Sequence, residues 1–360
     1  MKHKRNIWIM LYCLVLTAFT AYFLLDTFVI ARVYAVEGAA ASGGKQTEET
    51  AGSNQTLSAA PQNQQTDSRQ QTAGAESPEN DNEQESETTE NTLNQDGETP
   101  LLGSTVAQNA ITKTVTPVIT ENSYTDENIS IVITEYERDD TIIYVADVQL
   151  SSAEYLKTAL AQGAYGRNVT DETSSIASGV SAILAINGDY YGSQQRGYVI
   201  RNGVLYRSTA ASGRQDLVIY GDGSFEIITE GQVSAEELLA KGAQQVLSFG
   251  PGLVENGKVS VSSSYEVTKA MNSNPRTAIG VIDELHYLLV VADGRTAESE
   301  GLSVYELAQF MQSLGVQTAY NLDGGGSSTM YFNGSIVNNP TTNGRTIRER
   351  SVSDIVYIGY

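Results

Sequence analysis

Apolar and polar residues alternate along many short stretches in the second half of the chain, as in β-strands that bury one face. Between two such stretches, the residues Gly-Asp-Gly-Ser at 221–224 are typical of a hairpin turn. The pattern predicts a core rich in β-sheet. We expect strands at residues 129–136, 141–150, 182–187, 217–220, 225–229, 245–249, 277–282, 287–292, 318–322, 328–332 and 353–358.

Two stretches have the features of helices instead. Ser234 begins "SAEELLAKG" as an N-cap, glutamates follow in the first turn, and a glycine ends the segment. In "LSVYELAQFMQSLG", Ser303 and Glu306 have the spacing of a capping box. Because helices are few and strands many, we expect an α+β fold, with a mixed, mostly antiparallel sheet core and helices packed on it.

Residues 36–123 differ from the rest of the chain in composition. They contain no Phe, Trp or Tyr and are rich in Gln, Glu, Ser, Thr and Asn, so they cannot bury enough apolar surface to offset the entropy of ordering. Between residues 37 and 100 there are 13 acidic residues against two basic ones, a net charge of −11 out of −21 for the chain. We expect a disordered acidic linker here and a folded domain at 124–360.

Residues 1–35 have the character of a membrane segment. A basic flank at residues 2–5 precedes nineteen uncharged residues, Ile7 to Leu25, about the length needed to cross a bilayer. Since such a flank stays in the cytoplasm, we expect a single-pass membrane anchor with the C-terminal domain outside the cell. Small residues between positions 33 and 41 leave a cleaved signal peptide as the alternative.

The supply of reactive residues excludes several kinds of chemistry. Cys13 is the single cysteine and lies in the apolar run, so the exported part has no disulfide and no thiolate. The two histidines, His3 and His286, are too few for zinc sites built from Cys and His, and a Ser-His-Asp arrangement would depend on His286. Phosphate-loop and dinucleotide motifs are absent, as is the basic footprint of a nucleic-acid binder. Acid, base or nucleophile roles therefore fall to carboxylates, and anion binding falls to arginines and backbone amides.

Four short blocks at the ends of predicted strands have this character. They are "AINGDYYG" (185–192), "NPRTAIGV" (274–281), "VVADGRT" (290–296) and "NLDGGGSSTM" (321–330). Any one of them could be only a turn or a solvated charge. Sites are commonly built from loops at strand ends, so the four blocks together indicate a site.

These blocks also resemble a known family. "INGDYY", "FGPGLVENGK", "PRTAIGV", "DGR" and "NLDGGGSSTM", in this order, closely resemble the phosphodiester glycosidase family. That family includes the lysosomal uncovering enzyme, which removes N-acetylglucosamine from a phosphodiester linkage, and bacterial proteins labelled as involved in exopolysaccharide biosynthesis. The resemblance extends more weakly from about Asn128 to the C-terminal "SVSDIVYIGY" and does not include the linker or the anchor.

The resemblance implies a substrate in which sugar C1 is joined to a phosphate that carries a second group. Breaking the C1–O bond releases a phosphomonoester, whose second pKa is about 6, so the leaving group needs little protonation. Arg276 and Arg295 would clamp the phosphate. The backbone amides of Gly324, Gly325 and Gly326 would receive its other oxygens, and Ser327 and Ser328 would hydrogen-bond phosphate or sugar.

The same resemblance provides candidates for the catalytic carboxylate. Asp323 and Asp293 are candidates to activate water or attack C1. Asp189 is a third, although family members often have Asn-Gly-Gly-Phe-Phe where this chain has Asn-Gly-Asp-Tyr-Tyr at 187–191, so it is not a universal acid of the family. Asn187, in the same block, is a candidate for substrate binding.

Two functions from different classes fit these residues. One is a membrane-anchored hydrolase that cleaves glycosyl-1-phosphodiester linkages in envelope or exopolysaccharide glycopolymers. The other is a non-catalytic envelope module that binds anionic glycopolymer. No cofactor or metal is expected, with calcium held by Asp323, Asp293 or Asp189 as the rival interpretation. The expected partners are the glycopolymer or glycosyl phosphodiester and the membrane, with no nucleic acid.

Overall fold

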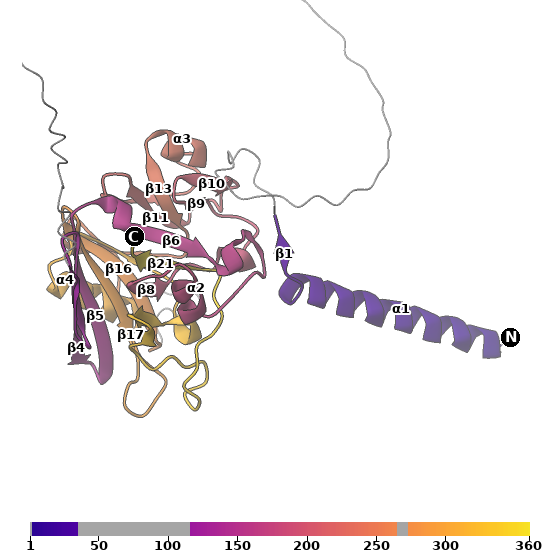
Figure 1. Ribbon diagram of the computed structural model, residues 1–360. Helices are drawn as coiled ribbons and strands as arrows, with labels where there is room; N and C mark the ends of the chain where they lie inside the picture. Colours follow the sequence, from indigo (N-terminus) through magenta and orange to yellow (C-terminus); the bar gives the residue numbers. More distant parts are fainter. Residues whose placement is uncertain (1, 35–115, 265–272) are drawn as a thin grey trace, which may run out of the picture. The chain divides into compact units, whose positions relative to one another are not determined.

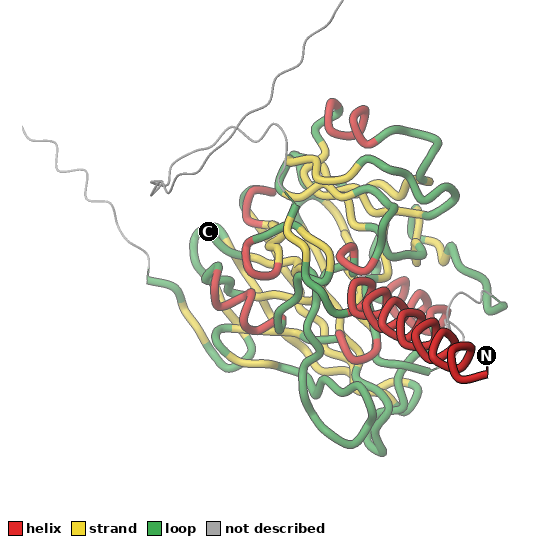
Figure 2. Tube along the Cα trace, turned by 90° about the vertical axis from the view of Figure 1, so that its right-hand side faces the viewer, coloured by secondary structure: helices red, strands yellow, loops and turns green. Residues whose placement is uncertain are grey.

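The computed structural model describes residues 2–34, 116–264 and 273–360. The domain is α+β, and the pairs between named strands in the described residues are antiparallel. Strands and loops make up most of it, with short helical segments between them (Figure 2). The expected fold class is therefore confirmed in its main feature, antiparallel sheets with few helices.

The largest sheet has nine strands, in the order β15-β14-β18-β16-β17-β5-β4-β3-β2. Alternation places Leu289 and Val291 in the main core, whereas Leu288 and Val290 face the second core, where helix α4 packs. The bounds are β2 Val118–Ile119, β3 Ser123–Thr125, β4 Ile129–Arg138, β5 Thr141–Leu150, β14 Gly252–Glu255, β15 Lys258–Val259, β16 Arg276–Asp283, β17 His286–Ala292 and β18 Thr318–Asn321.

Two smaller sheets of five strands complete the domain (Figure 1). Their orders are β10-β9-β13-β11-β12 and β20-β19-β8-β21-β6. The first comprises β9 Val199–Arg201, β10 Val204–Arg207, β11 Gln215–Tyr220, β12 Phe225–Thr229 and β13 Ala243–Leu247. The second comprises β6 Leu156–Leu160, β8 Leu184–Asn187, β19 Met330–Phe332, β20 Ser335–Ile336 and β21 Asp354–Ile358. The main core receives side chains from all three sheets, among them Leu217, Leu247, Leu184 and Val356.

Three α-helices of the domain pack on these sheets (Figure 1). They are α2 Thr173–Gly179, α3 Ala235–Ala240 and α4 Val304–Ser313, and the 3-10 helices are η1 Ala153–Tyr155, η2 Ala161–Gly163, η3 Tyr191–Ser193 and η4 Gly325–Ser327. Ser234 and Ser303 each form a complete capping box, with Glu237 and Glu306. Both predicted helices are confirmed, because the cap satisfies backbone N–H groups that the helix itself cannot.

The N-terminal segment forms helix α1, Lys2–Phe28, and the short strand β1, Arg32–Val33, which pairs with β7, Gly166–Arg167. In the described part of the chain, no helix combines the length and the apolar character that a bilayer crossing requires. The predicted membrane span is thus not confirmed.

Most of the linker predicted for residues 36–123 lies outside the described residues. Its last residues are described, and there Val118–Ile119 form β2, which pairs with β3. This end of the linker is corrected, because its backbone hydrogen bonds extend the large sheet. The predicted strand at 328–332 is also shorter than expected, since Ser327 still belongs to η4 and the strand begins at Met330.

Candidate functional site

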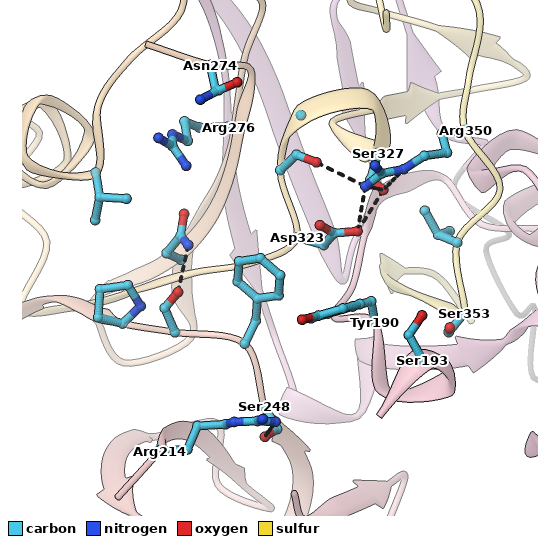
Figure 3. A pocket seen from close by; sticks show the side chains of 18 of the residues that line it. Tyr190, Ser193, Arg214, Ser248, Asn274, Arg276, Asp323, Ser327, Arg350 and Ser353 are labelled. Atoms are coloured by element: carbon cyan, nitrogen blue, oxygen red, sulfur yellow. Dashed lines mark hydrogen bonds and ion pairs between the residues drawn. The ribbon is translucent and has the colours of Figure 1, made fainter. Parts of the chain in front are cut away.

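A cavity of about 1110 Å³ lies where strand ends of the three sheets meet. Figure 3 shows its polar side chains converging from several separate segments. Because every one of these segments adjoins a strand, the sheets fix their relative positions. The lining includes Tyr190, Ser193, Arg214, Ser248, Phe249, Asn274, Arg276, Arg295, Asp323, Gly324, Gly325, Ser327, Arg350 and Ser353.

Asp323 is the carboxylate that lines this cavity, two residues after β18. Its side chain is 13% exposed, and Oδ2 accepts hydrogen bonds from Ser327 Oγ (2.7 Å) and Arg350 Nη2 (3.0 Å). Oδ1 has no hydrogen-bond partner in the described part of the chain. Burial raises the pKa of Asp323, and the charge of Arg350 acts in the opposite direction.

Arg350 is a site residue that the sequence did not indicate. Its guanidinium donates to Asp323 Oδ2, to Ser327 Oγ from Nε (2.9 Å), and to the carbonyl of Gly324 (3.2 Å). It comes from the irregular segment before β21 and is about half exposed. The segment has no hydrophobic period, and only the weakly family-like "SVSDIVYIGY" directly after it could have drawn attention to it.

The three consecutive glycines are required by close backbone packing. A Cβ on Gly324 would lie 2.9 Å from the Pro275 carbonyl oxygen, and one on Gly326 would lie 2.2 Å from Thr342 Oγ1. Gly325 has a φ of 65°, which side chains rarely adopt. Its N–H donates to Pro275 O (2.8 Å). Further along the turn, the amides of Ser327 and Ser328 donate to the carbonyls of Gly324 and Gly325. The expectation that all three glycine amides face the substrate is therefore wrong for Gly325, whose amide holds the turn against residue 275.

Arg276 and Arg295, the predicted phosphate clamp, both line the cavity. Arg276, the first residue of β16, is 8% exposed, and its Nε donates to the carbonyl of Leu302 (2.7 Å). Burial, and then the charge of Arg295, lowers the pKa of Arg276 to about 10, so it stays cationic at neutral pH. Arg295 is more exposed and donates to Asn274 Oδ1 (3.0 Å) and to Thr342 O (2.7 Å).

Asp189 does not reach the cavity lining. Its carboxylate is fully buried, where Oδ2 lies 2.9 Å from Arg201 Nη2 and Oδ1 accepts from the Tyr191 amide (2.9 Å). Arg201 also pairs with Asp354 at 2.7 Å. Asp189 Oδ2 further accepts from the Ser248 amide (2.8 Å), so it holds the loop that carries Ser248 and Phe249.

Asp293 does not line the cavity either. It is 3% exposed and accepts hydrogen bonds from Asn338 Nδ2 (2.8 Å) and from the Asn339 amide (3.1 Å). Burial raises the pKa of Asp293 despite these bonds. Through these contacts Asp293 fixes the segment after β20, and it does not face a substrate.

Asn187 and Ser328 are buried beneath the turn and do not line the cavity either. Asn187 Nδ2 donates to the Asp323 carbonyl (2.6 Å), and its Oδ1 accepts from Thr277 Oγ1 (2.8 Å) and the Thr329 amide (3.2 Å). Asn187 thus positions the backbone of Asp323. Ser328 Oγ has no partner in the described part of the chain, while its carbonyl accepts from Asn338.

The calcium alternative named Asp323, Asp293 or Asp189 as the residue that would hold the ion. In the described residues they do not form a common set, because Asp189 is bound to Arg201 and Asp293 to residues 338–339. The described part of the chain contains no group of three or more His, Cys, Asp or Glu side chains placed to hold a metal ion.

Comparison with known proteins identifies a family to which part of the chain is similar. Residues 181–359 match the family model described as phosphodiester glycosidase. Residues 181–359 are therefore assigned to the phosphodiester glycosidase family. The resemblance expected from the sequence is thereby confirmed.

Two relatives and one solved structure show the extent of the similarity. The SPbeta prophage-derived uncharacterized protein YomE of Bacillus subtilis (strain 168) is 27% identical over 270 residues, 69% of this chain and 41% of that protein. The N-acetylglucosamine-1-phosphodiester alpha-N-acetylglucosaminidase of Mus musculus is 31% identical over 192 residues, 49% of this chain and 36% of that protein. The chain thus spans less than half of the length of these curated relatives.

The solved structure is the zebrafish N-acetylglucosamine-1-phosphodiester alpha-N-acetylglucosaminidase catalytic domain auto-inhibited by its pro-peptide. It aligns with a TM-score of 0.52 and 20% identity, covering 64% of this chain and 83% of that chain. At this identity, the alignment shows that this phosphodiester glycosidase domain shares the fold.

Proposed function

We propose that this phosphodiester glycosidase domain hydrolyses glycosyl-1-phosphodiesters by breaking the bond between sugar C1 and a phosphate oxygen. The observation that carries the proposal is the Asp323 carboxylate in a cavity lined by several arginines. A carboxylate and a cationic anion site in one cavity are what this reaction needs. Family membership and the printed activity of the mouse relative support the same reaction class.

In the proposed mechanism the substrate phosphate lies against Arg276 and Arg295. Their positive charges stabilise the negative charge that builds on the phosphate oxygen as it leaves C1 with the bonding electron pair. The product is a phosphomonoester with a second pKa of about 6, so it leaves at neutral pH without a general acid. This accounts for a site whose lining contains no histidine among the described residues.

Asp323 supplies the other half of the reaction. Arg350 and Ser327 hold Oδ2, which leaves Oδ1 to accept a proton from water or to attack C1. If water attacks, its oxygen bonds to C1, its proton passes to Asp323, and the phosphate leaves. If Asp323 attacks C1, the C1–O bond to the phosphate breaks, the phosphomonoester leaves and a glycosyl ester forms. Water then hydrolyses this ester, which releases the sugar and regenerates the carboxylate.

The setting of the reaction is a separate part of the proposal, which rests on the sequence. The basic flank and the apolar run at residues 2–25 support attachment to the membrane with the domain outside the cell. Envelope or exopolysaccharide glycopolymers are then the substrates within reach. Fractionation of cells, followed by protease treatment from outside, tests this. Recovery of the chain in the cytosol would contradict it.

The experiment that tests the activity is hydrolysis of N-acetylglucosamine 1-(methyl phosphate) in 18O-enriched water by the full chain. Cleavage at C1 places the label in the released sugar, whereas cleavage at phosphorus places it in methyl phosphate. Labelled sugar is the expected result. Binding of the compound with no turnover would instead favour the non-catalytic glycopolymer-binding module.

A further inference from the structure

The cavity has a second cationic end that the proposed mechanism does not use. Arg214 and Ser248 lie at the bottom of the view and Arg276 and Asn274 at the top, with Asp323 and Tyr190 at intermediate height toward the right (Figure 3). Arg214 directly precedes β11, and Ser248 directly follows β13, which pairs with β11. This end is therefore fixed by the sheet.

Most N–H donors of the Arg214 guanidinium have no acceptor among the described residues. Its Nη1 donates to Ser248 Oγ (3.1 Å), and no other acceptor for its side chain is found among the described residues. No ion pair of the described part of the chain includes Arg214, whereas Arg350 pairs with Asp323. An arginine with several unused N–H donors at a cavity wall is suited to a forked contact with an anion.

Two acidic side chains near this end, Glu230 and Asp216, form no ion pair with Arg214 in the described part of the chain. Glu230 accepts from Ser248 Oγ (2.9 Å), from the Tyr198 amide (3.1 Å) and from the Ala211 amide. Asp216 is fully buried, and burial together with the charge of Glu230 raises its pKa well above the usual value. Glu230 and Asp216 therefore neutralise the positive charge of Arg214 only in part.

An aromatic pair occupies the wall between the two cationic ends. The rings of Tyr190 and Phe249 meet edge to face with centroids 5.3 Å apart, and Tyr190 is 37% exposed. Such rings offer an apolar face on which the C–H face of a sugar can pack. The cavity of about 1110 Å³ also exceeds the roughly 300–1,000 Å³ of ordinary small-ligand sites. It has room for more than one sugar and one phosphate.

We infer that Arg214, with Ser248, is a second anion-binding subsite, and that the substrate sugar carries a phosphate on the side away from C1. The substrate class is then an internal unit of a poly(glycosyl phosphate), held at both phosphates, with the sugar on Tyr190 and C1 beside Asp323. The inference rests on the proposed function for the direction of cleavage. It adds that the domain cuts within a chain and that its preference depends on Arg214.

Three substrates and two variants of the full chain test this inference. The substrates are N-acetylglucosamine 1-(methyl phosphate), the same compound with a second methyl phosphate on O6, and its analogue with a carboxylate at C6. The variants are Arg214→Gln and, as control, Arg138→Gln, whose exposed side chain lies outside the cavity beside Asp139. The readout is the ratio of kcat/KM for the doubly charged substrate to that for the singly charged one.

We expect the wild type and Arg138→Gln to favour the 6-phosphate substrate at least tenfold, and Arg214→Gln to lose most of that preference. Added salt should reduce the wild-type preference as well. An equal ratio in wild type and Arg214→Gln overturns the subsite while leaving the proposed function intact. If kcat/KM rises for the analogue with a carboxylate at C6 and does not rise for the 6-phosphate substrate, the assignment of this subsite to phosphate is wrong.

If the wild type hydrolyses none of these compounds, the proposed function fails and the subsite is decided by binding. Calorimetry with the 6-phosphate and the singly charged compounds should then show tighter binding of the former to wild type. That difference should shrink in Arg214→Gln and persist in Arg138→Gln. Equal affinities in the wild type would refute the subsite.

Discussion

Aspartate meets arginine in two regions of the domain, and the two regions differ in their access to solvent. At the cavity, Arg350 is 45% and Asp323 13% exposed. In the interior, Arg201 is 2% exposed and both of its partners, Asp189 and Asp354, are fully buried. The same residue types therefore form an accessible pair at one place and a sealed cluster at the other.

The hydrogen bonds show what this difference means for function. Arg201 donates to Asp189, to Asp354 and to the carbonyls of Ile200 and Val246, and it lies over the Tyr191 ring at 5.6 Å. Such a cluster ties β9, β13 and β21 together and cannot exchange a partner for substrate. Asp323 keeps one carboxylate oxygen toward the cavity. Access to solvent, more than the presence of an ion pair, separates the candidate catalytic carboxylate from the structural ones.

The most direct way to break this comparison is the substitution Asp323→Asn. It preserves shape and removes the charge, so we expect kcat to fall at least about a thousandfold, which corresponds to about 4 kcal/mol in transition-state energy. Substrate binding should change much less. Steady-state kinetics on a glycosyl phosphodiester, with thermal unfolding as the check on folding, measures both. Wild-type turnover by a folded variant would remove Asp323 from the chemistry.

A substitution in the buried cluster of Arg201, Asp189 and Asp354 should lower the free energy of unfolding. Arg201→Met leaves two carboxylates in the interior without their partner, a change that typically costs about 3–5 kcal/mol. Urea unfolding should show this loss. Because burial already raises the pKa of Asp354, the loss should grow as pH rises and the carboxylates are forced to ionise.

A triple variant is the control for Arg201→Met. Adding Asp189→Asn and Asp354→Asn removes the buried negative charge and should restore part of the stability. If Arg201→Met alone leaves the free energy of unfolding unchanged, the cluster does not stabilise the fold.

The sequence predicted the long strands and the helix caps well because those features are local. Alternation over ten residues set β5 at Thr141–Leu150, and the serine and glutamate spacing set the start of α4. Two-residue strands such as β2 and β20 were missed, since they carry too few residues to show a period.

The site was only partly predictable for a related reason. Asp323 and Arg276 lie in glycine- and proline-marked blocks at strand ends, so composition and position identified them. Arg350 lies in an irregular segment, and its contact with Asp323, 27 residues earlier, depends on how the chain returns to β21. Likewise, nothing local distinguishes Asp189 from Asp323, because burial by packing alone gives them different roles.

The pairing of Arg350 with Asp323 leads to a third prediction, on pH dependence. Arg350 favours the ionised carboxylate, so Arg350→Gln should raise the pKa of Asp323 further. The acidic limb of the kcat/KM profile should then move to higher pH. The loss of activity should be greatest at pH values on that acidic limb. Arg345→Gln, a nearby exposed change, should leave the limb in place. An unmoved limb in Arg350→Gln would show that Asp323 does not titrate in it.

The smallest effect is expected for Asp293, which the sequence ranked beside Asp323. Because Asp293 holds residues 338–339 and does not line the cavity, Asp293→Asn should leave kcat close to wild type. Losing a charged acceptor should lower the free energy of unfolding by about 1–2 kcal/mol. Burial raises the pKa of Asp293 in the folded state, so its ionisation weakens the wild-type fold as pH rises. The stability gap between variant and wild type should therefore narrow as pH rises from the unfolded-state pKa of about 4 through the raised folded-state pKa of Asp293. Denaturant unfolding across pH measures the gap, and a kcat as low as that of Asp323→Asn would place the chemistry on Asp293 instead.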